Sequence, residues 1–105
     1  MTTFDKREEA FEKKFALDAE LKFKAEARRN RLLGLWVAEK LGITGEPATA
    51  YARETVADAF AEGGDPAVVA RVAHDLSAKG ITGEEIRARM TELMAQAVAQ
   101  LKAGR

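Results

Sequence analysis

Cysteine is absent from this chain of 105 residues, and histidine and serine each occur once. The lack of cysteine excludes disulfides and thiolate ligands, and it fits a reducing compartment. His74 alone cannot supply the three or four converging ligands of a metal site, and its place beside Asp75 on the polar side of a helix indicates a solvated side chain. Ser77 has no histidine and acid in a recognisable catalytic setting. The sequence therefore predicts no enzyme, no metal and no cofactor.

Net charge of one sign and long apolar runs are also lacking. The 17 basic and 17 acidic residues cancel, so no global field draws the chain to nucleic acid or to an anionic membrane. No apolar run approaches the roughly 20 residues that span a bilayer. We expect a soluble, unexported, cytoplasmic protein of one domain, without direct membrane insertion and with partners that are recognised locally.

Helix-forming residues dominate what is present. Alanine, leucine, glutamate, lysine and arginine are abundant, and before Gly42 only Gly34 interrupts the helical preference. The apolar phase changes near Leu17 and Asp18, where Asp18 can cap a second helix. We therefore divide the chain into an N-terminal arm, residues 1–17, and a helical bundle, residues 18–105. The expected fold is all-α, a four-helix bundle with an additional N-terminal helical or partly disordered arm.

The first two bundle helices are predicted from caps and apolar stripes. The first runs from Asp18 to the stop at Gly42, with Trp36 in the interior. The second has Pro47 in its first turn and ends at the Gly63-Gly64 pair. Its apolar face is predicted to be buried and comprises Ala48, Tyr51, Ala52, Thr55, Val56, Ala59 and Phe60.

The last two helices carry start signals of their own. Asp65 is predicted to cap the third helix, with Pro66 at its first helical position and Gly80 as its stop. Thr82 lies three residues before Glu85, which is the spacing of a capping box at the start of the fourth helix.

One short sequence is repeated: GITGE occurs at residues 42–46 and again at residues 80–84. Each copy is a glycine stop followed by a threonine cap, so we interpret the copies as two similar turns between helices. The alternative is a shared binding loop, but the copies lack the long glycine loop and the lysine of a phosphate cradle.

A basic run, KFKAEARRNR at residues 22–31, has five basic side chains against one acidic side chain. Arginines that contact phosphates and a phenylalanine that stacks on a base would make it a nucleic-acid footprint. Contact with an acidic protein surface explains the run equally well, and a solvated helix face explains it without any partner. All three interpretations stay open. The basic residues concerned are Lys22, Lys24, Arg28, Arg29 and Arg31.

The segment FDKREEAFEKKF, residues 4–15, places Phe4, Phe11 and Phe15 on one helical face among eight charged residues. An isolated helix of this length is marginal in water. Full burial of three phenylalanines contributes roughly 5 to 9 kcal/mol before ordering costs. This is enough to hold the helix either on the bundle or in the groove of a partner, and the residues alone do not decide between the two.

The N-terminal half resembles a known family. The most specific part of the similarity is FEKKFAxDxELxFKxxARRNxLLGLWxAxxLG, and the later helices with their Gly-Asx-Pro turns fit as well. This pattern is similar to that of the zeta subunit of the alphaproteobacterial F-type ATP synthase. One departure is Leu17, where many members carry histidine, so a pH response that rests on this position is not carried over.

The resemblance implies an inhibitor of ATP hydrolysis that acts as a wedge. The implied partners are the catalytic and central-stalk subunits of the water-soluble sector. The arm would insert at a catalytic interface beside the rotating stalk and become helical there, with secondary contacts from the basic run. The free protein is expected to be a monomer, held at the cytoplasmic face of the membrane only through the ATP synthase. The implied arm contacts are Phe4, Asp5, Lys6, Arg7, Glu8, Phe11, Glu12, Lys14 and Phe15.

Two other functions stay open beside this one. A nucleic-acid-associated helical module that uses residues 22–31 is the main alternative, and steep loss of binding with added salt would favour it. A bundle that binds a small molecule such as an adenine nucleotide is the third possibility, and no motif supports it.

Overall fold

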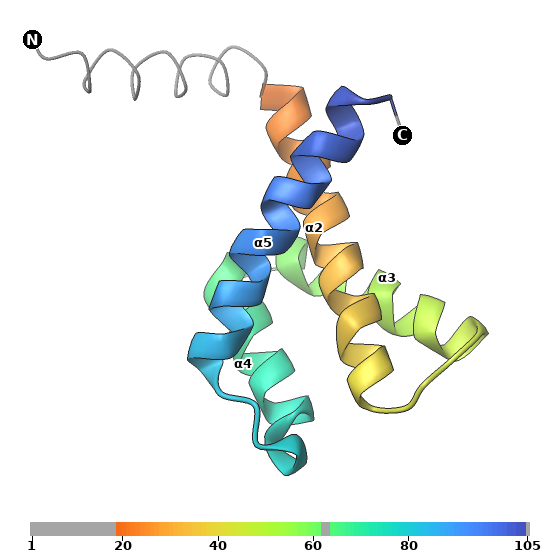
Figure 1. Cartoon of the computed structure of the whole chain (residues 1–105), viewed down its shortest axis with the longest axis vertical. Helices are drawn as coiled ribbons and strands as arrows, with labels where there is room; N and C mark the ends of the chain where they lie inside the picture. The colour runs from red at the N-terminus through yellow and green to blue at the C-terminus, as the bar shows by residue number, and fades with distance from the viewer. Residues whose placement is uncertain (1–18, 62–63, 105) are drawn as a thin grey trace, which may run out of the picture.

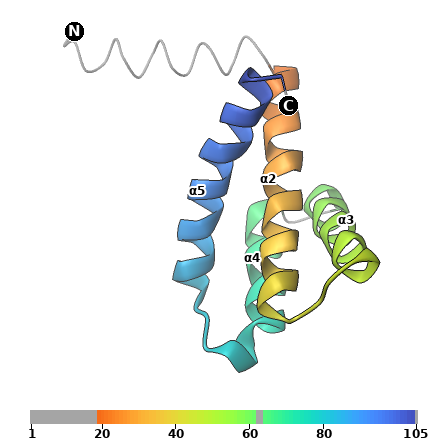
Figure 2. The same ribbon diagram turned by 45° about the vertical axis from the view of Figure 1, so that its right-hand side comes forward.

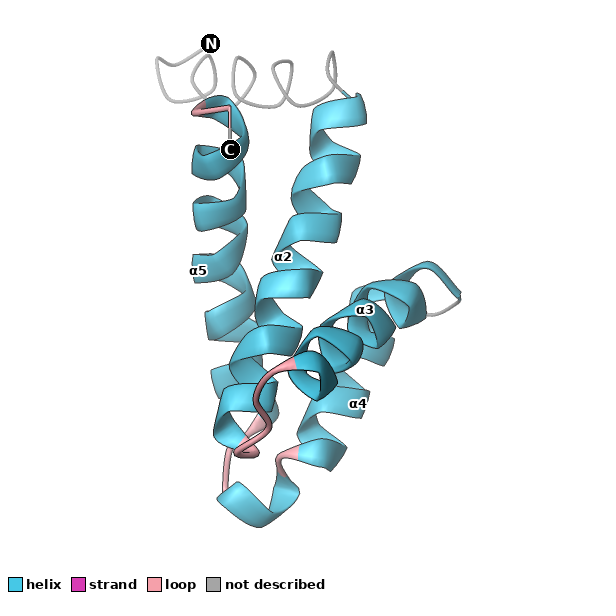
Figure 3. Cartoon of the chain, turned by 90° about the vertical axis from the view of Figure 1, so that its right-hand side faces the viewer, coloured by secondary structure: helices cyan, strands magenta, loops and turns pink. Residues whose placement is uncertain are grey.

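The computed structural model describes residues 19–61 and 64–104. Within these two ranges every regular element is a helix and no strand occurs (Figure 3). The predicted all-α class with four bundle helices is confirmed. The predicted arm, residues 1–17, and the predicted cap Asp18 lie outside the described residues. The elements are α2 (Ala19–Lys40), α3 (Glu46–Ala61), α4 (Gly64–Asp75), the short 3-10 helix η1 (Ser77–Lys79) and α5 (Gly83–Lys102).

Helix α2 is the central helix. It packs against α3 and against α5, while α4 packs against both α3 and α5. Figures 1 and 2 show α2 and α5 running antiparallel, so the first turns of α2 and the last turns of α5 lie at the same end of the bundle. Helical propensity alone leaves such segments marginal, and the apolar side chains that meet between them decide how they pack.

The core draws its large side chains from α2, α4 and α5, and from the turn that follows α4. Helix α3 contributes small buried side chains instead, Ala52 and Thr55, which allow it to approach α2 closely. The core cluster consists of Leu33, Val37, Val68, Val69, Val72, Leu76, Ile86, Met90 and Leu93.

Gly34 marks the place where α2 and α3 come closest. A Cβ atom at this position would lie 2.6 Å from Cα of Ala52 and 2.9 Å from Oγ1 of Thr55. Such contacts are too short for carbon, so the crossing requires glycine. The buried Thr55 hydroxyl donates to the backbone carbonyl of Tyr51 at 2.9 Å, which satisfies it within its own helix. The glycine that interrupts helical propensity in the sequence is therefore the one that lets two helices meet.

The prediction that Trp36 lies in the interior is wrong. Its ring is only partly buried and packs against the edge of the core. The ammonium of Lys40 lies 5.8 Å from the ring centroid, and the guanidinium of Arg89 lies 5.6 Å from it. Trp36 therefore sits where the core meets solvent, in cation–π contact with two basic side chains.

Some helix starts differ from the prediction. Pro47 lies in the first turn of α3, as expected for a residue without an N–H. Gly64 opens α4 rather than closing α3, so the predicted Gly63-Gly64 terminator is wrong at its second residue. Asp65 consequently lies inside the first turn of α4 and is not its cap. Helix α4 ends at Asp75, and η1 carries the chain on to the predicted stop at Gly80.

The two GITGE copies adopt different geometries. In the second copy, Oγ1 of Thr82 accepts the backbone N–H of Glu85 at 3.2 Å, which confirms the predicted cap of α5. In the first copy, α3 begins only after Gly45, whose φ is +68°. The residue equivalent to Glu85 is Pro47, which has no N–H to donate, so Thr44 cannot form the same cap. The predicted threonine cap is therefore wrong for the first copy, while the predicted glycine stop is present in both copies, since Gly42 and Gly80 have φ angles of +75° and +71°.

Candidate functional site

The residues that the resemblance implies as arm contacts, from Phe4 to Phe15, lie outside the described residues. The structure bears on the site through the surface of the bundle. The arm joins the bundle at the first turn of α2, and the predicted basic run occupies residues 22–31 of the same helix. This part of α2 is the first surface to examine for a partner.

Four of the five basic side chains of the run lie on the surface, three of them exposed and Arg28 half-buried. Nζ of Lys24 lies 3.0 Å from a carboxylate oxygen of Glu20. Nη1 of Arg28 donates to Oε1 of Gln100 on α5 across 3.5 Å. We call these four side chains the basic patch: Lys22, Lys24, Arg28 and Arg31.

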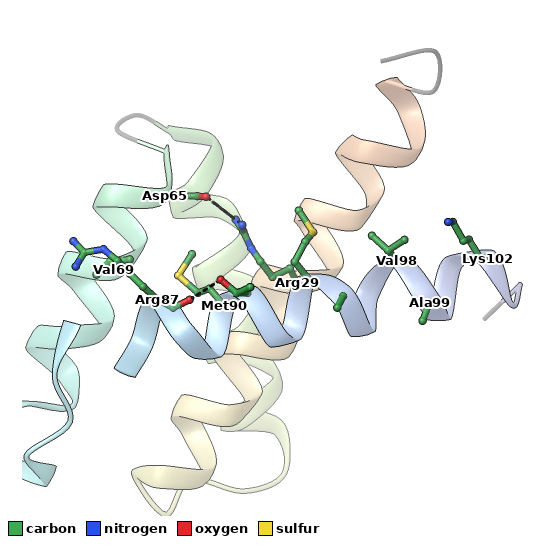
Figure 4. A pocket seen from close by; sticks show the side chains of 11 residues that line it. Arg29, Asp65, Val69, Arg87, Met90, Val98, Ala99 and Lys102 are labelled. Atoms are coloured by element: carbon green, nitrogen blue, oxygen red, sulfur yellow. Dashed lines mark hydrogen bonds and ion pairs between the residues drawn. The ribbon is translucent and has the colours of Figure 1, made fainter. Parts of the chain in front are cut away.

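The prediction of Arg29 as a surface contact is wrong. Its side chain is 8% exposed, and Nη2 and Nη1 donate to the two carboxylate oxygens of Asp65 at 2.6 and 3.1 Å. Nε and Nη2 also donate to Oδ1 of Asn30 at 3.1 and 3.0 Å. This bidentate pair ties α2 to the start of α4 (Figure 4). The missed signal is the spacing of Ala25, Arg29 and Leu33, which are four residues apart and share the buried face of α2.

An exposed aromatic pair lies beside the basic patch. The rings of Phe23 on α2 and Phe60 on α3 stack with centroids 5.0 Å apart, and the side chains are 56% and 50% exposed. The prediction that Phe60 is buried is wrong, because the last turn of α3 meets the outer face of α2 at Phe23 and not the core. A recess of about 360 Å³ adjoins the pair, lined by Phe23, Lys24, Ala27, Arg28, Arg31, Val56 and Leu101.

A larger groove, of about 760 Å³, runs along α5 (Figure 4). Met90, Met94 and Val98 give it a mainly apolar wall, and the Arg29–Asp65 pair also lines it. Thioether and aliphatic side chains supply contact surface but no acid, base or nucleophile. A mainly apolar wall of this kind gives the groove the character of a binding surface.

A tyrosine with a strongly perturbed phenol lies between α3 and α4. Tyr51 donates to Asp75, and burial together with this hydrogen bond raises the pKa of the Tyr51 phenol well above its usual range. The guanidinium of Arg71 lies 4.9 Å from the centroid of the Tyr51 ring, pairs with Asp58 and lies 3.2 Å from Glu54. Because each member has a partner and the cluster joins two helices, we interpret it as structural.

Side chains that ligate metals do not gather in the described part of the chain, where no group of three or more histidine, cysteine, aspartate or glutamate residues occurs. His74 is exposed, as predicted. Over residues 19–61 and 64–104, none of the helices has the length and apolar character that crossing a membrane requires.

Comparison with known proteins decides the family. A sequence model described as ATPase inhibitor subunit zeta matches residues 1–100. The chain belongs to this family. The match takes in the predicted arm as well as the described helices up to the last turn of α5. The resemblance found in the sequence is confirmed.

One solved structure supports the fold independently. A solution NMR structure of a protein with 49% sequence identity superposes with a TM-score of 0.72 and covers 81% of this chain and 99% of that chain. A search of curated proteins found no match. In a member of an inhibitor family, the candidate surfaces for a protein partner are the basic patch with its aromatic pair and the α5 groove.

Proposed function

We propose that this protein, which is not an enzyme, inhibits ATP hydrolysis by the F-type ATP synthase. The observation that carries the proposal is the match to the ATPase inhibitor subunit zeta family, which runs from residue 1 to residue 100. The match includes the segment with three phenylalanines on one helical face, which is the part of the chain best suited to enter a partner's groove.

The arm, residues 1–17, is the inhibitory element in this proposal, and the bundle, residues 18–105, is its folded carrier. Phe4, Phe11 and Phe15 act as apolar anchors at a catalytic interface beside the central stalk, where the arm blocks rotation in the hydrolysis direction. Ordering on binding lowers the affinity per contact but allows release when rotation reverses. The flanking charges that steer the arm and set its register are Asp5, Lys6, Arg7, Glu8, Glu12 and Lys14.

The proposed partners are the catalytic and central-stalk subunits of the water-soluble sector. The protein acts at the cytoplasmic face of the membrane and is a monomer when free. Nucleic acid is not a proposed partner, since the basic and acidic residues are equal in number. The alternative of a nucleic-acid-associated module also loses one of its five basic residues, because Arg29 is engaged by Asp65.

The proposal is tested with the purified water-soluble sector of the ATP synthase from the same cell. The full-length protein should suppress ATP hydrolysis and affect synthesis far less. The triple variant Phe4→Ala, Phe11→Ala, Phe15→Ala should abolish suppression while the far-ultraviolet circular dichroism of the bundle stays unchanged, because buried apolar anchors carry most of the energy of such contacts.

Lys14→Ala is the control from the same segment, and it should weaken suppression less than the triple variant does, since flanking charges contribute less than anchors. A triple variant that suppresses hydrolysis as well as the parent would show that the arm is not the inhibitory element.

A further inference from the structure

We propose that the basic patch and the Phe23–Phe60 pair form a second docking surface, which binds an acidic protein surface of the ATP synthase next to the binding site of the arm. This inference rests on the proposed function, because it takes the arm to be bound to that enzyme. In this proposal the bundle contacts the enzyme as well as the arm does.

This surface exposes large apolar side chains. Phe23 and Phe60 are about half exposed, whereas the other large apolar side chains of the described residues are more buried. Phenylalanine and arginine are enriched in protein interfaces, where anchors enter pockets. The recess beside Phe23 has Val56 and Leu101 in its wall, so it suits an apolar side chain of a partner.

The same surface carries a local excess of positive charge. Two of the five basic residues of the run form an ion pair: Arg29 pairs with Asp65, and Lys24 pairs with Glu20. The other three form no ion pair within the described ranges 19–61 and 64–104: Lys22, Arg28 and Arg31. Since the chain as a whole is neutral, this charge is a feature of the patch, and it selects an acidic surface opposite.

The aromatic geometry favours a protein over a nucleic acid. The rings of Phe23 and Phe60 stack on each other with an interplanar angle of 28°, so each covers one face of the other. Platforms for single-stranded nucleic acid instead present separate ring faces to successive bases along a charged groove. The recess beside the pair combines Val56 and Leu101 with three basic side chains, which suits a protein surface that presents an apolar side chain among acidic ones.

The aromatic pair lies close to the arm along the chain. Residues 15 and 19 are four residues apart and are separated by at most about 14 Å, even in a fully extended chain. Phe23 lies one turn into α2, about 6 Å further along the helix. Phe23 therefore stays within about 20 Å of Phe15, whatever the conformation of the residues between them. An arm held in the enzyme therefore keeps Phe23 within reach of the enzyme surface.

The test measures binding of the full-length protein to the purified water-soluble sector by fluorescence anisotropy at several salt concentrations. Arg31→Glu and Phe60→Ala are the variants, and Lys79→Glu is the matched control. Lys79 is exposed and lies in η1, at the end of the bundle away from the first turns of α2 (Figure 1). The substitution Lys79→Glu changes the net charge by the same amount as Arg31→Glu does.

We expect Arg31→Glu and Phe60→Ala each to weaken binding about tenfold, as loss of an interface anchor does. Arg31→Glu should also flatten the salt dependence, and Lys79→Glu should bind like the parent. If both patch variants bind the enzyme as tightly as Lys79→Glu does, the docking surface is refuted. Unchanged enzyme binding combined with lost binding of single-stranded RNA would refute it as well, and would assign the patch to nucleic acid.

Failure of this inference differs from failure of the proposed function. The triple phenylalanine variant of the arm should lose inhibition yet keep a weak, salt-sensitive binding to the enzyme, and adding Arg31→Glu should remove that binding. Residual binding that is indifferent to Arg31→Glu contradicts the docking surface, whether or not the arm inhibits.

Discussion

Gly34→Ala tests the packing of α2 on α3 with a single methyl group. The new Cβ would lie 2.6 Å from Cα of Ala52, a backbone atom that cannot rotate away, and 2.9 Å from Oγ1 of Thr55. Forcing extra volume into a packed crossing costs about 1 to 3 kcal/mol, and contact with backbone argues for the upper part of this range. Replacement of an interior helical glycine by alanine returns about 1 kcal/mol of helix propensity.

The expected net loss in the free energy of unfolding is about 1 to 2 kcal/mol. For a domain of this size, that lowers the thermal midpoint by roughly 5 to 15 °C. Thermal and urea unfolding followed by far-ultraviolet circular dichroism measure both quantities. The single tryptophan, Trp36 on the same helix, gives an independent fluorescence signal.

Gly83→Ala is the control, since Gly83 is the first residue of α5 and a Cβ there meets only ordinary contacts, 3.6 Å from Nη1 of Arg87 and 3.9 Å from Cγ1 of Val69. It should leave stability unchanged or raise it by about 0.4 to 1 kcal/mol, because alanine restricts the unfolded chain. If Gly34→Ala is as stable as the parent while Gly83→Ala behaves as expected, the close approach of α2 and α3 is refuted.

Three further predictions concern the contacts that join the helices. Because the pKa of Tyr51 is raised in the folded protein, the unfolded chain loses the phenolic proton first, so stability should be level up to about pH 10 and fall above it. Tyr51→Phe should remove this fall, and tyrosinate absorbance reports on Tyr51 alone because it is the only tyrosine; a native pKa near the usual value would contradict the burial. Asp65→Ala leaves the buried guanidinium of Arg29 without its carboxylate and should cost about 1.5 to 3 kcal/mol in urea unfolding, with a smaller loss for Asp65→Asn, which keeps one oxygen acceptor; an Asp65→Asn variant as stable as the parent would mean that the carboxylate charge contributes nothing. Trp36→Ala should cost about 1 to 2 kcal/mol in the same assay, since the indole is only partly buried; a larger loss would place the ring inside the core.

The sequence predicts that the candidate site is basic and where it lies in the chain, but not which residues belong to its surface. The basic run and its position at the start of the bundle follow from the residues themselves. The sequence does not show which of these basic residues face solvent, because the carboxylate that pairs with Arg29 belongs to Asp65, 36 residues further along the chain. Phe60 likewise belongs to the surface pair because the end of α3 meets Phe23, a contact that the period of α3 does not encode.

The sequence by itself determined the features that depend on neighbours along the chain. These are the all-α class, the positions of the helices to within a few residues and the cap of α5 by Thr82, since propensity and capping act over a turn or less. Only the tertiary structure decided why Gly34 must be glycine, why Arg29 is buried and why Trp36 is not. The physical reason is that each of these depends on atoms brought into contact from another helix, and one methyl group or one carboxylate at such a contact outweighs the local preference.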